Sequence, residues 1–146
     1  MIFYTILLIF TSLLLFILSL IHIYWAFGGL WPGDSKQDLI DKVFGKGNQF
    51  PSPISCIFVA SSLLIFSLLP ILWMNQKSEW INPQILIWVR ICMAFVSFIF
   101  FIRGVLGYLP FLTKHWKPIF VHYTKRIYNP LCLFLGFAFL MMIILG

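Results

Sequence analysis

Residues 2–27 constrain the fold more than any other stretch of the chain. They contain no Asp, Glu, Lys or Arg, and the run exceeds the roughly 20 apolar residues that cross the hydrocarbon core of a bilayer. The run is too long for a secretory signal, no positive charge precedes it, and no small-residue cleavage site follows it. We therefore predict a first transmembrane helix that the mature protein retains.

Three further apolar segments complete a predicted bundle of four transmembrane helices. The chain is 62% hydrophobic and 10% charged, whereas soluble domains carry about 25% charged residues. A backbone in lipid must satisfy its own hydrogen bonds, so we predict an all-α integral membrane protein. Asn82-Pro83 and Asn129-Pro130 suit helix starts, because Asn caps free amides and Pro lacks one. We expect a single domain over residues 1–146, with spans at 2–27, 53–74, 82–109 and 128–145.

Basic residues are distributed unevenly between the predicted loops. The segments 28–52 and 103–127 carry eight Lys or Arg residues, whereas the loop between the second and third spans carries only Lys77. Because Lys and Arg accumulate in cytoplasmic loops, we expect both long loops inside and both termini outside. Anionic headgroups explain the net charge of +6, so we expect membrane lipids and not nucleic acid as partners.

The first long loop contains the signal for a short helix. Ser35-Lys36-Gln37-Asp38 matches a capping box, and Gly45 can end the following turn. Apolar residues recur between them at helical spacing, so we predict an amphipathic helix over 35–44 on the membrane surface. Lysines alternate with the acidic residues of this loop, which favours a solvated polar face over a metal site.

Small and polar residues form one stripe on the first span and another on the third, and such stripes mark helix contacts in lipid. His22 lies on the first stripe and Arg90 on the third-span stripe. No span contains an acidic residue that could pair with Arg90. Arg90 therefore either extends to the outer headgroups or contributes to a secondary polar site.

His22 has two interpretations: a structural histidine bonded to a neighbouring segment, or a ligand-binding or proton-carrying group. Haem ligation would require His115 or His122, which we expect in a surface loop. No cysteine cluster, Ser-His-Asp set, P-loop or glycine-rich nucleotide motif accompanies His22. We predict no cofactor and no metal, assign no catalytic residue, and favour a protein that is not an enzyme.

Two short motifs carry a family resemblance. His22-x-x-Trp25-x-x-Gly28-Gly29 ends the first span, and Tyr128-Asn129-Pro130-Leu131-Cys132-Leu133 enters the last. With the hydropathy layout of nearly the whole chain, they resemble a family of small four-helix bacterial inner-membrane proteins classed as a domain of unknown function. The resemblance implies a bacterial inner-membrane location and supplies no activity. An acidic residue commonly precedes the second motif in that family, and Thr124 stands at this place here.

The favoured functional hypothesis is binding, and by extension transport, of an amphiphilic or anionic small molecule or lipid in an intramembrane pocket open to the cytoplasm. Two alternatives stay open: an accessory subunit of a larger membrane complex, and a membrane enzyme acting on a lipid or quinone with His22 as acid or base. A homo-oligomer or a membrane-protein partner is compatible with each. The predicted ligand-binding residues are His22, Trp25, Gly28, Gly29, Arg103, Tyr108 and Asn129.

Overall fold

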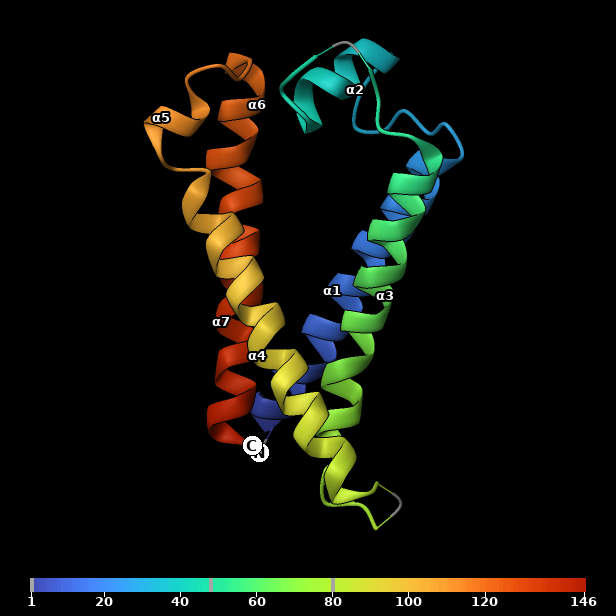
Figure 1. Ribbon diagram of the computed structural model, residues 1–146, viewed down its shortest axis with the longest axis vertical. Coiled ribbons are helices and arrows are strands. Elements are labelled where there is room, and N and C mark those ends of the chain that lie inside the picture. Colours follow the sequence, from blue (N-terminus) through green and yellow to red (C-terminus); the bar gives the residue numbers. More distant parts are fainter. Residues whose placement is uncertain (1, 48, 80) are drawn as a thin grey trace.

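The computed structural model describes residues 2–47, 49–79 and 81–146, and the described chain is all-helical (Figure 1). Within these ranges, four helices are long and apolar enough to cross a membrane, so the chain is a multi-pass membrane protein. The long helices are α1 (Ile2–Ala26), α3 (Pro53–Met74), α4 (Pro83–Leu106) and α7 (Asn129–Leu145). The shorter elements are α2 (Lys36–Val43), α5 (Pro110–Thr113), α6 (Pro118–Tyr123) and the π-helical turn η1 (Thr124–Tyr128).

The long helices form two antiparallel pairs, α1 with α3 and α4 with α7. Figure 1 shows the pairs meeting at one end and diverging toward the other, so the bundle has the shape of a V. Both chain termini lie where the pairs meet, and we call this the terminus end. The opposite end carries α2, α5 and α6, and we call it the loop end.

Within each pair, small residues bring the backbones together and serine hydroxyls join them. Ser12 Oγ donates to the Ser67 carbonyl at 2.6 Å, and Ser19 Oγ donates to the Ala60 carbonyl at 2.7 Å. In the second pair, Ser97 Oγ donates to the Gly136 carbonyl at 2.7 Å. Serine hydroxyls find acceptors on the next helix because lipid offers none.

The core between the two pairs is concentrated toward the terminus end. Large apolar side chains from all four long helices interlock there, and Phe139, Met93 and Met142 are 0% exposed. Tyr4 Oη and Trp73 Nε1 both donate to the Met142 carbonyl, at 3.1 and 3.0 Å. These two bonds tie the first pair to the second.

Helices α3 and α4 each begin at a proline, and the side chain of the residue before that proline caps the helix. Ser52 Oγ accepts from the Ser55 amide at 3.2 Å before Pro53, and Asn82 Oδ1 accepts from the Gln84 amide at 2.9 Å before Pro83. The predicted second span coincides with α3, and α1 ends one residue before the predicted boundary. Helix α4 ends at Leu106 and not at 109, because its last turn closes at Gly107.

Helix α7 begins at Asn129, as the dipeptide Asn129-Pro130 predicts, but the last apolar span begins further back than predicted. Elements α6, η1 and α7 follow one another without a break, and the apolar span runs from Pro118 to Leu145. Pro130 has no amide hydrogen for the Arg126 carbonyl, and its ring would crowd that carbonyl in a regular α-helix. The wider π-turn before Pro130 relieves this conflict, with the Asn129 amide donating to the Thr124 carbonyl.

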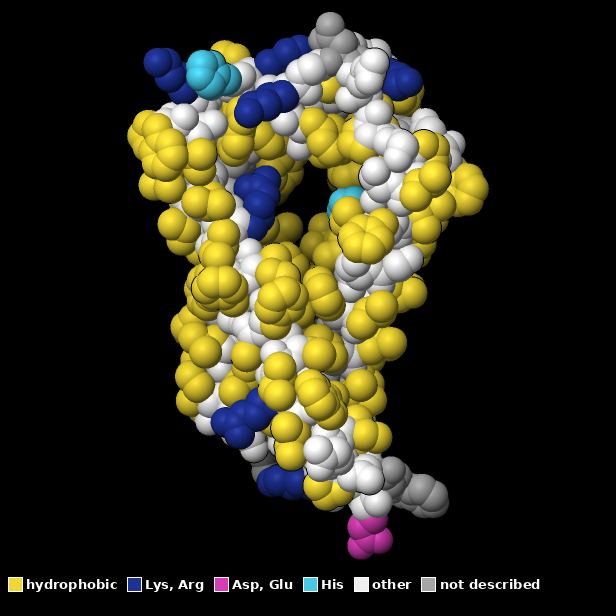
Figure 2. All heavy atoms as spheres, viewed as in Figure 1, with side chains coloured by type: hydrophobic (Ala, Val, Ile, Leu, Met, Phe, Trp, Pro, Cys, Tyr) yellow, Lys and Arg dark blue, Asp and Glu magenta, His cyan; other side chains and the backbone are white. Residues whose placement is uncertain are grey.

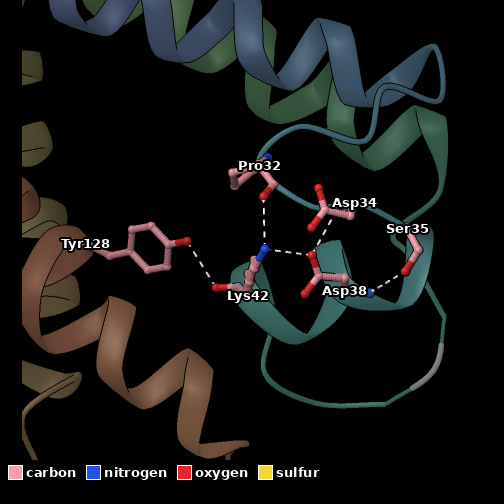
Figure 3. Close-up of polar contacts among 6 residues, drawn as sticks. All are labelled: Pro32, Asp34, Ser35, Asp38, Lys42 and Tyr128. Atoms are coloured by element: carbon pink, nitrogen blue, oxygen red, sulfur yellow. Dashed lines mark hydrogen bonds and ion pairs between the residues drawn. The ribbon is translucent and has the colours of Figure 1, made fainter.

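Helix α2 forms where the capping box predicts it, with one change. Ser35 Oγ accepts from the Asp38 amide at 3.2 Å, but Asp38 Oδ2 accepts from the Asp34 amide at 2.9 Å and not from Ser35 (Figure 3). Gly45 ends the helix with φ +67°. Leu39 and Ile40 are each 1% exposed, so the apolar face of α2 packs against the protein.

Candidate functional site

An opening passes between the diverging helix pairs near the loop end (Figure 2). Hydrophobic side chains form most of its border, with a Lys or Arg side chain on one rim and a histidine on the facing rim. Arg103 lies in the last turn of α4, and His22 lies one turn before the end of α1. These two residues therefore stand at the same level of the two pairs.

On the α1 side, the His22 ring is held by its own helix. His22 Nδ1 lies 2.8 Å from the Leu18 carbonyl, and the ring contacts the Trp25 ring edge-to-face at 4.9 Å. Trp25 is itself only 9% exposed, and its Nε1 donates to the Trp31 carbonyl at 2.7 Å. Trp25 therefore packs as a core residue of the loop end and fixes the position of His22.

Gly28 and Gly29 let the chain leave α1 sharply. Gly28 has φ +86°, a conformation that glycine adopts without strain, and a Cβ on Gly29 would collide with the Tyr24 ring. A small pocket of about 130 Å³ lies between this turn and α2. It is lined by Trp25, Gly28, Gly29, Leu30, Lys36, Leu39 and Phe50.

On the opposite side, Asn129 packs directly on α4. A Cβ on Gly107 would collide with the Asn129 amide, so only glycine permits this approach. Asn129 is 0% exposed, and its Oδ1 and Nδ2 have no hydrogen-bond partner among the described residues. Thr124 Oγ1 is also buried and also has no hydrogen-bond partner among the described residues. The junction of η1 and α7 thus holds polar atoms whose hydrogen-bonding capacity is unused.

Arg103 is an exposed cation without an ion-pair partner in the described part of the chain. The four acidic residues of the sequence all lie outside the four long helices. On the loop side, Asp38 pairs with Lys42 and Asp41 pairs with Lys117. Neither of these two ion pairs includes Arg103.

Arg90 and Tyr108 are both exposed, although Arg90 belongs to the inward stripe predicted for the third span. Arg90 is exposed and is placed more than three turns before Arg103, toward the terminus end. Tyr108 is 41% exposed, and its hydroxyl donates to the Lys125 carbonyl at 3.2 Å. The buried face of α4 instead contains Val89, Met93, Val96, Ser97 and Gly104.

A set of contacts that no sequence pattern indicates closes the loop end, and we call it the clasp: Asp41, Lys42, Gly45, Lys117 and Tyr128. Lys117 Nζ pairs with Asp41, and the Lys117 amide donates to the Gly45 carbonyl at 3.0 Å. Tyr128 Oη donates to the Lys42 carbonyl at 3.0 Å (Figure 3). The clasp joins the first long loop to α6 and η1 across the top of the opening.

Hydrogen bonds in and near the clasp keep the acidic side chains of α2 ionised. The hydrogen bond from Lys117 holds the pKa of Asp41 below its usual value. The hydrogen bond from Lys42 and the Asp34 amide lower the pKa of Asp38, and Asp38 raises the pKa of Lys42. These carboxylates are thus held ionised and already paired.

The seven predicted ligand-binding residues are divided between the two helix pairs. His22, Trp25, Gly28 and Gly29 belong to the α1 wall, and Arg103, Tyr108 and Asn129 belong to the α4–α7 wall. Within the described ranges, no three His, Cys, Asp or Glu side chains lie close enough to hold a metal ion. The groups that remain available are the Arg103 cation, which can bind an anion, and the His22 imidazole and Asn129 amide, which can form hydrogen bonds.

Comparison with known proteins gives a family and no activity. No curated protein and no solved structure shows a significant match to the chain. The sequence pattern of one family matches residues 15–139, a range that contains both motifs of the first and last spans. The chain therefore belongs to the family described as "Protein of unknown function (DUF3995)".

Proposed function

We propose that the protein binds an anionic amphiphile, a lipid or a lipid-like small molecule, in the opening between its two helix pairs. The observation that carries the proposal is Arg103, which has no ion-pair partner among the described residues and lies in the last turn of α4. Near this end of α4 the helix pairs diverge around an opening with mostly hydrophobic borders (Figure 2). A cation without a counter-ion is costly at membrane depth, even at an exposed position of its helix, and an anionic ligand offsets that cost.

The shape of the bundle supports lateral entry. The clasp covers the loop end and the interlocked core closes the terminus end, so the opening faces the surrounding lipid on its sides. An apolar tail fits between the pairs, and the anionic group reaches Arg103. We place the protein in a bacterial inner membrane with the loop end in the cytoplasm, following the excess of basic residues there. Transport would require the pairs to alternate in their separation.

The test is lipid retention by the purified protein. Native mass spectrometry after mild solubilisation in mixed phosphatidylglycerol and phosphatidylcholine should show preferential retention of the anionic lipid. Arg103→Gln should lower that retention by about tenfold, because a charge-assisted bond is lost. The matched control is Arg90→Gln, which removes the same charge from the exposed face of the same helix. Equal retention by the Arg103 and Arg90 variants contradicts the proposal.

A further inference from the structure

The hydrogen-bonding state of His22 follows from its neighbour. Nδ1 lies 2.8 Å from the Leu18 carbonyl oxygen, and a carbonyl oxygen can only accept. Nδ1 therefore carries the hydrogen, and in the neutral ring Nε2 keeps its lone pair and acts as an acceptor. No described residue donates a hydrogen bond to Nε2.

The facing wall has the opposite character. The Arg103 guanidinium carries only donors and a permanent positive charge. It has no acidic partner among the described residues, and no acid lies within the long helices. A ligand that satisfies both walls must present an anion to Arg103 and a hydrogen-bond donor to His22.

We infer that the ligand's headgroup joins an anionic group to a hydroxyl, as in a phosphodiester that carries a glycerol. This inference rests on the proposed function and specifies its ligand class. An ammonium group could also donate to His22, but it would be repelled by Arg103 and by the basic residues of the loop end, and no carboxylate in the spans would receive it. A choline headgroup has no donor at all.

His22 is suited to this recognition because its ring is already oriented. The Leu18 carbonyl fixes one ring nitrogen, and the edge-to-face contact with Trp25 fixes the ring plane. Trp25 is in turn held by the Trp31 carbonyl and packed against Leu39 and Cys56. The acceptor on Nε2 is thus presented without further ordering of the side chain, which favours selective binding.

The experiment compares two lipids that differ only in their donors. Phosphatidylglycerol and phosphatidylethanol with the same acyl chains are both phosphodiesters with one negative charge, but only the first carries headgroup hydroxyls. Competition for the purified protein in phosphatidylcholine nanodiscs should favour phosphatidylglycerol several-fold, up to about tenfold for one or two hydrogen bonds. His22→Phe should bring this ratio close to one, whereas Arg103→Gln should weaken binding of both lipids.

The control is His122→Phe, which removes an exposed histidine of the loop end and should keep the preference. If His22→Phe does not fold, His22→Leu replaces it and should also remove the preference. Equal binding of the two lipids by the unchanged protein overturns the inference and leaves the proposed function intact. Absence of binding by both lipids overturns the proposed function as well.

Discussion

The two ends of the bundle are built from different kinds of contact. At the terminus end, large side chains such as Phe139 and Met93 reach between the pairs, and the Met142 carbonyl binds donors from α1 and α3. At the loop end, contacts within each pair are made by small residues, for example Ser19 on Ala60 and Gly107 on Asn129. Between the pairs, the loop end is joined by the clasp and by the Lys46 ammonium, which lies 5.9 Å from the centre of the Trp116 ring.

This difference explains why the pairs diverge. Small residues let two helices approach closely, but they leave no side chain long enough to reach a third helix. The terminus end therefore supplies most of the packing between the pairs, and the loop end supplies unpaired polar groups. The same division places Arg103 and the buried amide of Asn129 at the loop end, outside the core that the two pairs share.

The largest expected effect is at the terminus end. Phe139→Ala leaves a cavity in the shared core and should lower the free energy of unfolding by about 3 kcal/mol. This value is the lower bound for such changes in soluble cores, and we choose it because lipid also solvates the ring that the substitution removes. Titration with sodium dodecyl sulfate in mixed micelles measures it. Phe137→Ala, on the exposed face of the same helix at 55% exposure, is the control. Similar losses for both variants would mean that the terminus end is no solid core.

The second effect tests close approach within a pair. Gly107→Ala places a methyl group against the Asn129 amide and should cost roughly 1–3 kcal/mol in the same titration. The double variant Gly107→Ala, Asn129→Ala removes the collision and should recover most of the loss. Additive losses in the double variant would show that the Asn129 amide is not the group in contact.

The elements of the fold could be predicted from the sequence because each depends on local chemistry. The apolar runs, the Ser35 cap and the Asn82-Pro83 start all act within a few residues. Asn129-Pro130 carries the same dipeptide signal as Asn82-Pro83 and has a different outcome. The segment before Asn129 is itself helical from Pro118, so α7 continues from a π-turn and the Asn129 side chain caps no helix.

The third prediction concerns the cost of unused polar groups. Asn129→Leu removes two buried atoms without partners while nearly keeping the side-chain shape, so it should raise the free energy of unfolding by about 1 kcal/mol. Ser97→Ala, which removes a bond to the Gly136 carbonyl, should instead lower it by about 0.6 kcal/mol. A loss in Asn129→Leu would reveal that the amide has a partner in the membrane.

The site was less predictable than the fold because its geometry depends on how the pairs are placed. His22 and Arg103 could be assigned to one membrane level by counting residues along their helices. The exposure of Arg90 and Tyr108 could not, because it depends on how α4 is rotated about its own axis, and the structure buries Val89 and exposes Arg90. Asp41 and Lys117 are 76 residues apart, and no local pattern relates two such charges.

The smallest effect on stability, and the most direct one on shape, concerns the clasp. Spin labels on Ile57→Cys and Val105→Cys, with the native cysteines replaced by serine, report the separation of α3 and α4 near the loop end by double electron–electron resonance. Lys117→Ala should lengthen and broaden this distance at neutral pH, because it removes the ion pair with Asp41. Lys114→Ala, an exposed lysine nearby, should leave it unchanged.

The distance between the spin labels on α3 and α4 should increase at acidic pH. Lys117 lowers the pKa of Asp41, so the contribution of this pair is complete above the usual aspartate pKa near 3.9 and is lost as pH falls through the lowered value. Acidification below about pH 4 should therefore separate the pairs in the unchanged protein and have less effect in Lys117→Ala. Exchange of the two charges, Asp41→Lys with Lys117→Asp, should restore the short distance at neutral pH. An unchanged distance in every variant would mean that the backbone bond of Gly45 and the hydroxyl of Tyr128 hold the loop end closed without the ion pair.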